Sequence, residues 1–64
     1  MDLLEKRLRK ESRELRKKIS VIEEFFKTEE FEQMKITYQS LLIRQHAHMS
    51  EYAKILEERI LLHD

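Results

Sequence analysis

The chain contains no glycine, no proline and no cysteine. Glycine and proline mark turns and interrupt helices, so their joint absence argues against a fold rich in strands or loops. The lack of cysteine excludes disulfides and agrees with a reducing compartment. The remaining composition is dominated by Glu, Lys, Arg, Leu and Ile, which is typical of coiled coils and long helical hairpins.

Long hydrophobic runs are also missing. No stretch approaches the roughly 18 apolar residues that a membrane span requires. The N-terminus becomes charged at Glu5, Lys6 and Arg7, unlike a signal peptide. We therefore expect a soluble, cytoplasmic protein that has no membrane partner.

The size of the chain limits how it can be stabilised. Its 64 residues allow one domain, 1–64, and a chain this short buries only about 60% of its unfolded surface. Domains of this size usually gain stability from disulfides, a metal or oligomerisation. Disulfides are impossible here and the potential metal ligands are poorly spaced, so we expect a homo-oligomer.

Apolar residues recur at alternating spacings of three and four in both halves of the chain, as in coiled-coil helices. The first half carries Leu8, Ser12, Leu15, Ile19, Ile22 and Phe26. The second half carries Met34, Tyr38, Leu41, Leu42, Gln45, Met49, Tyr52, Leu56 and Ile60. This pattern predicts an all-α fold, a coiled-coil-like antiparallel two-helix hairpin.

The turn is expected near the middle of the chain. Thr28 can cap a helix that begins with Glu29 and Glu30, and Thr37 is a second candidate cap. We predict one helix over about 3–27, a turn region over about 28–36 and a second helix over about 37–62. The alternative is a single uninterrupted helix without a turn.

The second helix carries a wider apolar stripe than one partner helix can cover, because Ile55, Leu61 and Leu62 broaden it. We therefore expect hairpins to assemble into a helical-bundle homo-oligomer. The residues predicted to mediate self-association are Leu8, Leu15, Ile19, Ile22, Phe26, Leu41, Leu42, Gln45, Met49, Leu56 and Ile60.

Charge is segregated although the net charge is zero. Residues 1–18 hold eight basic and four acidic residues, whereas 19–34 hold five acids and one lysine. Arginine offers paired donors to phosphate. A basic patch at helical spacing is a candidate phosphate site, comprising Lys6, Arg9, Lys10, Arg13, Arg16 and Lys17. Two other interpretations remain open: a solvated helix face, and a basic end that meets the acidic turn of another copy.

Nothing in the sequence predicts catalysis, a metal or another cofactor. His46 and His48 are two residues apart and so point in different directions on a helix. We expect one interface histidine and one exposed histidine. No glycine-rich phosphate loop exists, and two helices cannot enclose a dry catalytic pocket. Duplex DNA is disfavoured because the pI of about 6.8 shows no basic excess.

Two tyrosines, Tyr38 and Tyr52, lie within the second stripe. They combine a large apolar surface with a hydroxyl. One interpretation is simple core packing, and the other is that they line a pocket between protomers.

A family resemblance covers nearly the whole chain. It rests on Arg7-Leu8, Glu14-Leu15, Lys18-Ile19, Glu24-Phe25, Phe31, Leu41-Leu42, Gln45, Met49, Tyr52, Leu56 and Arg59-Ile60. With this pattern the chain resembles small uncharacterised helical-hairpin proteins of phages and prophages, including crAss-like phages. The resemblance implies a phage accessory gene, and it transfers no catalytic residues. Such accessory proteins often antagonise host defence, and some phage immune-evasion proteins are helical oligomers that sequester nucleotide messengers.

These observations lead to one hypothesis and two alternatives. The hypothesis is a non-catalytic homo-oligomer that acts in the host cytoplasm and sequesters a cyclic nucleotide or other phosphate ligand. The first alternative is an inhibitor or adaptor that docks a helix face on a host protein. The second is a structural assembly factor with no ligand beyond itself.

Overall fold

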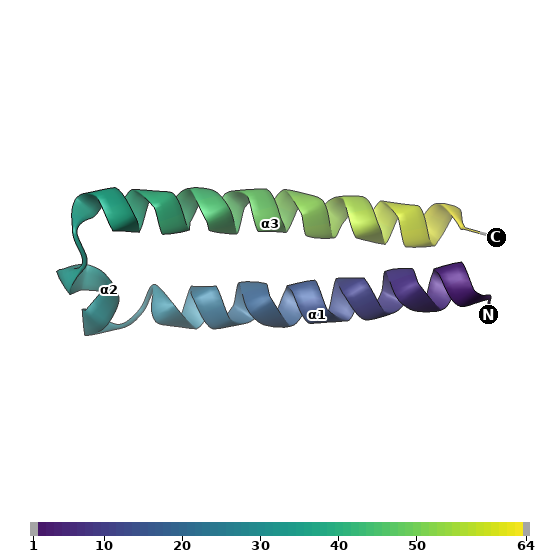
Figure 1. The fold of residues 1–64 in the computed structure, drawn as a ribbon, viewed down its shortest axis with the longest axis horizontal. Coiled ribbons are helices and arrows are strands. Elements are labelled where there is room, and N and C mark those ends of the chain that lie inside the picture. Colours follow the sequence, from purple (N-terminus) through teal and green to yellow (C-terminus); the bar gives the residue numbers. More distant parts are fainter. Residues whose placement is uncertain (1, 64) are drawn as a thin grey trace.

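The computed structural model describes residues 2–63 as a helical hairpin. Helix α1 spans Leu3–Phe25, the short helix α2 spans Glu29–Gln33, and helix α3 spans Ile36–Leu62. Figure 1 shows α1 and α3 side by side and antiparallel, joined through α2 at one end, with both termini at the other. The rod measures 47 × 15 × 13 Å. The predicted all-α hairpin is therefore confirmed, and the alternative of one uninterrupted helix is wrong.

Helix α1 begins with a capping side chain and ends without glycine. The Asp2 carboxylate accepts a hydrogen bond from the backbone N–H of Glu5 at 2.8 Å, which satisfies one of the free donors of the first turn. The helix ends at Phe25, after which Phe26 and Lys27 form a turn before Thr28.

Thr28 organises the first part of the reversal. Its side-chain oxygen accepts from the backbone N–H of Phe31 at 3.2 Å, so it caps α2 as the sequence predicts. The same hydroxyl donates to the carbonyl of Phe25 at 2.7 Å. One side chain thus satisfies backbone groups at the end of α1 and at the start of α2.

The second part of the reversal uses extended backbone. Met34 has φ −68° and ψ 150°, and Lys35 has φ −58° and ψ 142°. Gln39 of α3 donates its side-chain amide to the carbonyl of Phe31 at 2.6 Å and so ties α2 to α3. Within residues 2–63 no residue has a positive φ. The turn therefore needs no glycine, because it avoids the left-handed region that favours it.

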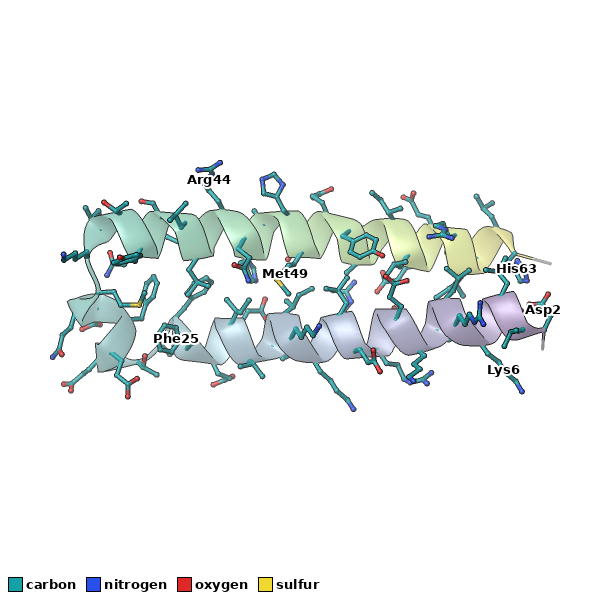
Figure 2. The ribbon with its side chains drawn as sticks, viewed as in Figure 1. Asp2, Lys6, Phe25, Arg44, Met49 and His63 are labelled. Carbon is teal, nitrogen blue, oxygen red and sulfur yellow. The ribbon has the colours of Figure 1, made fainter. Side chains whose placement is uncertain are left out.

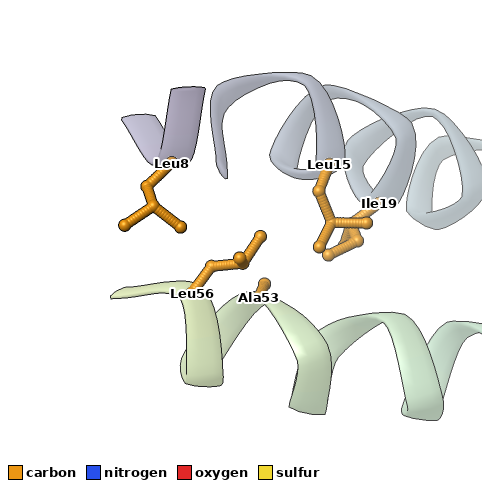
Figure 3. Packing of buried hydrophobic residues seen from close by; sticks show 5 residues of the cluster. All are labelled: Leu8, Leu15, Ile19, Ala53 and Leu56. Carbon is orange, nitrogen blue, oxygen red and sulfur yellow. The ribbon is translucent and has the colours of Figure 1, made fainter. Parts of the chain in front are cut away.

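Five side chains form the buried core, which lies toward the terminal half of the rod. Leu8, Leu15 and Ile19 come from α1, and Ala53 and Leu56 come from α3. Figure 3 shows the α1 side chains pointing onto Ala53 and Leu56 across the interface. Complete burial of a leucine contributes about 1.5–3 kcal/mol. The small core therefore depends strongly on each of its members.

Aromatic rings close the turn end. The Phe31 ring of α2 lies 5.9 Å from the ring of Phe25 in an edge-to-face arrangement. It lies 5.0 Å from the ring of Phe26, whose other neighbour is His46 at 5.4 Å. Such pairs add about 0.5–1.5 kcal/mol beyond simple burial. These contacts hold α2 against the ends of both long helices.

Two adjacent stripes of largely apolar residues run along α3. The inner stripe packs on α1, and all its residues are buried or half-buried. It consists of Leu42, His46, Met49, Ala53, Leu56 and Ile60. The outer stripe is exposed and consists of Tyr38, Leu41, Gln45, His48, Tyr52 and Ile55. Each stripe alternates spacings of three and four, and a shift of one residue turns them about 100° apart. The single wide stripe that the sequence predicts for this helix combines members of both.

Within residues 2–63, none of the three helices combines the length and the hydrophobicity needed to cross a bilayer.

Candidate functional site

The basic patch is divided between two sides of α1. Lys6, Lys10, Arg13 and Lys17 follow one another at spacings of four, three and four, and all are exposed. This spacing places them on one helix face. Figure 2 shows Lys6 pointing away from α3. The face therefore looks toward solvent within the hairpin.

The two remaining arginines of the patch are engaged in ion pairs. Arg9 pairs with Glu5 one turn earlier on α1, at 3.1 Å. Arg16 pairs with Glu57 across the interface to α3. Each arginine already has a carboxylate partner, so a ligand phosphate would have to compete for it.

A shallow groove lies between α1 and α3, closer to the turn than the buried core. It has a volume of about 380 Å³, within the general range of small-molecule sites. We name it the lysine groove by its lining residues, Lys17, Lys18, Val21, Ile22, Gln45 and Met49. Figure 2 shows Met49 pointing from α3 toward α1, where it forms part of the groove. The groove surface is mainly apolar, and two lysines and one glutamine contribute to its lining, Lys17 from its outer edge.

The charge of the lysine groove is wholly positive. Its lining contains no acidic residue. Among residues 2–63, the ion pairs do not include Lys17 or Lys18. Gln45 directs its side-chain amide nitrogen to the sulfur of Met49 at 3.7 Å, a weak acceptor. Neither lysine of the lining therefore has an ion-pair partner within the described residues.

The sequence predicts part of this groove. Its pattern indicates Lys17 as a phosphate ligand and Ile22, Gln45 and Met49 as self-association residues, but it does not indicate Lys18 or Val21. Val21 lies off the α1 stripe and is 69% exposed. A signal was present, because Lys17-Lys18 is followed by Val21-Ile22 one turn later and thus on the same side of the helix.

The tyrosines do not line the lysine groove of a single hairpin. Tyr52 donates its hydroxyl to the carboxylate of Glu11 on α1. This hydrogen bond raises the pKa of Tyr52, and desolvation and the Glu11 charge add to the rise. Tyr38 is 57% exposed near the start of α3. Both rings belong to the outer stripe, so a pocket built from them would require a second chain.

Two histidines pair with carboxylates across the helix interface. The His46 ring nitrogen lies 3.0 Å from a carboxylate oxygen of Glu23, and His48 is exposed. In the single hairpin it is therefore His46 that is half-buried toward α1. His63 lies 2.8 Å from Asp2, so the helix ends are held together. The pKa of Asp2 is lowered, first by the hydrogen bond from the backbone of Glu5 and then by His63.

The residues predicted for self-association fall into three groups by their position in the hairpin. Leu8, Leu15, Ile19 and Leu56 are buried in the core of the single chain. A second group is half-buried between the helices or at the turn end: Ile22, Phe26, Leu42, Met49 and Ile60. Leu41 and Gln45 are exposed on the outer stripe. Contacts with another chain are therefore open to the last group.

Metal ligands do not gather in the described residues 2–63, where no three His, Asp or Glu side chains are placed to hold an ion. The lysine groove presents lysines, an amide and apolar surface, and α3 presents an exposed apolar face.

Comparison with curated proteins finds no significant match. Comparison with solved structures also finds none. The family model described as Sequestin matches residues 2–62, which is nearly the whole chain. This chain therefore belongs to the Sequestin family.

Proposed function

We propose that this protein is a non-catalytic binding protein that sequesters a phosphate-bearing nucleotide. The lysine groove is the observation that supports this function most strongly. Two ammonium groups on neighbouring residues can hold phosphate oxygens. Val21, Ile22 and Met49 provide the apolar surface that a base requires. The family name, Sequestin, agrees with a sequestering role.

The biological setting of the proposal follows from the resemblance to phage hairpin proteins. A phage protein that binds a nucleotide signal without converting it would lower the free concentration of that signal in the host cytoplasm. Such an antagonist of host defence needs high abundance and affinity, and it needs no catalytic group. A small homo-oligomer without a dry catalytic pocket is suited to this task.

Isothermal titration with a panel of cyclic oligonucleotides tests the proposal. The wild-type protein should release heat with at least one member, and the affinity should fall with rising salt because phosphate recognition is electrostatic. Failure of every member to bind a preparation of defined oligomeric state would contradict the proposed function.

A pair of charge-matched variants tests the site. Lys17→Gln with Lys18→Gln should abolish the binding heat. Lys35→Gln with Lys54→Gln removes the same charge from exposed lysines outside the groove and should leave binding within about threefold of wild type. Equal loss of binding in both double variants would show that overall positive charge, and not the lysine groove, holds the ligand.

The exposed outer stripe supports a second candidate, an inhibitor or adaptor that docks α3 on a host protein. An amphipathic helix face of this kind is a common element of helix-in-groove recognition. This candidate predicts a stable 1:1 complex on pull-down from host lysate that is indifferent to nucleotides. A complex that nucleotides displace would support the first proposal over it.

A further inference from the structure

The outer stripe of α3 is an apolar face that the hairpin itself does not cover. Leu41 is 52% exposed and Ile55 is 51% exposed. Tyr38 and Tyr52 extend the same face, so four large side chains lie along about five turns of one helix. Their alternating spacings of three and four match the seams by which helices pack on one another.

We infer that a second copy of this chain covers the outer stripe by packing its own α3 antiparallel against it. The residue order along the stripe is self-complementary. In one register Tyr38 lies opposite the partner's Ile55, and Leu41 lies opposite the partner's Tyr52. Gln45 then lies opposite the partner's His48 at the two-fold axis. Apolar residues meet apolar residues, and the polar pair meets at the centre.

The polar central layer helps to select this register. Shifting the antiparallel pair by one heptad would set Leu41 opposite the partner's Arg59 and Gln45 opposite the partner's Ile55. Such a shift would bury amide and guanidinium groups against apolar side chains, which is unfavourable without hydrogen-bond partners. A single polar layer in a helical seam commonly fixes register in this way.

The distribution of charge favours the antiparallel orientation. Glu29, Glu30 and Glu32 lie exposed in α2 at the turn end. Lys6 and Lys10 lie exposed near the terminal end of α1. An antiparallel pair in the stated register places each acidic turn beside the basic terminal end of the other copy. A parallel pair would place the acidic turns together, and like charges would oppose it.

Dimerisation would also complete the lysine groove. Gln45 belongs both to the groove lining and to the outer stripe. The partner's His48 would therefore stand at the edge of the groove and add an imidazole to it. The two grooves would flank the two-fold axis. This part of the inference rests on the proposed function, because it assigns a second chain to the same ligand site.

Sedimentation without nucleotide tests the interface. The wild-type chain should be a dimer at micromolar concentration, and Leu41→Glu should make it a monomer with unchanged helix content. Ile43→Glu is the matched control, because Ile43 is 53% exposed on the same helix but on the other side of Leu42. A wild-type monomer, or equal dissociation by both variants, would overturn the inference.

Disulfide trapping tests the register in a chain that has no cysteine of its own. Tyr38→Cys with Ile55→Cys should oxidise to a covalent dimer, since these positions are about 25 Å apart along one helix and cannot join within a chain. Tyr38→Cys with Leu62→Cys reports the register shifted by one heptad and should form the dimer at least tenfold more slowly. Faster trapping by the second pair would refute the register.

Titration of the same variants separates the interface from the ligand site. Lys18→Gln should remain a dimer and lose the nucleotide heat, whereas the Leu41→Glu monomer should bind at least tenfold more weakly than wild type. Wild-type affinity in that monomer would refute the composite groove. A wild-type chain that sediments as a dimer and binds no nucleotide would instead reject the proposed function and leave the interface established.

Discussion

The hydroxyl of Tyr52 on α3 donates a hydrogen bond to the carboxylate of Glu11 on α1. The bond crosses the helix interface on the side where the outer stripe lies, and it fixes the ring of one stripe member relative to α1. Because the phenol is held at its polar tip, its apolar face stays available along α3. A surface side chain is thereby oriented before any partner binds.

Tyr52 should make the hairpin sensitive to alkaline pH. Its pKa is raised in the folded chain, chiefly by the hydrogen bond to Glu11. A raised pKa means that the stabilisation is present below the unfolded pKa of about 10 and is lost as the pH rises through the folded pKa. Circular dichroism measures the helix content as the pH is raised. The helix content of the wild type should fall at a lower pH than that of Tyr52→Phe, because phenylalanine cannot ionise. Identical alkaline transitions would show that the bond does not contribute.

Asp2 should act at the opposite end of the pH range. Its pKa is lowered below the usual 3.8, first by the backbone hydrogen bond from Glu5 and then by His63. The stabilisation is therefore present above that value and is lost as the pH falls through the folded pKa. The protection factors of the first-turn amides of α1, which correct for the slower intrinsic exchange at low pH, should fall on acidification. Asp2→Asn should remove this pH dependence, and an unchanged profile in that variant would assign it to other carboxylates.

Leu56 should be the most sensitive position of the core. Its side chain is 0% exposed, and Leu56→Ala should lower the free energy of unfolding by about 2–5 kcal/mol through lost burial and a residual cavity. Leu61→Ala is the control, because Leu61 is 82% exposed on the same helix. Urea denaturation at one fixed chain concentration measures both, since oligomerisation makes stability depend on concentration. Equal losses would place the core elsewhere.

Thr28 should matter more to stability than its place in a turn suggests. Thr28→Ala removes both the cap of α2 and the hydrogen bond to Phe25, and it should cost about 1–2 kcal/mol. Thr37→Ala is the comparison, because Thr37 is exposed in the first turn of α3 and α3 has no side-chain cap. Thermal unfolding of the two variants should show the larger decrease in Tm for Thr28→Ala.

The helices and the hairpin could be predicted from the sequence because they depend on local pattern. The spacing of Leu8, Leu15 and Ile19 indicates the buried side of α1. The capping side chain of Thr28 indicates where α2 begins. These signals require no knowledge of distant contacts. The homo-oligomer and the functional residues stay predictions, since they concern molecules outside the single chain.

The division of α3 into two stripes could not be predicted in the same way. Leu41 and Leu42 are neighbours in sequence, and each fits a repeat of three and four. Which one faces α1 depends on how α3 is rotated, and that rotation is set by the partner side chains of α1. The lysine groove is equally hidden in sequence, because Lys18 and Gln45 come together only when the two helices align.

The reversal at Met34 and Lys35 uses only extended backbone angles, which every amino acid can adopt. Evolution is therefore free to exchange the residues at these two positions, and a glycine signature should not mark the turn among homologues. Selection should act instead on a hydroxyl-bearing residue at the position of Thr28 and on an amide at that of Gln39. An alignment of the Sequestin family should therefore show a hydroxyl-bearing residue and an amide at these two positions, and they would mark the turn of the hairpin.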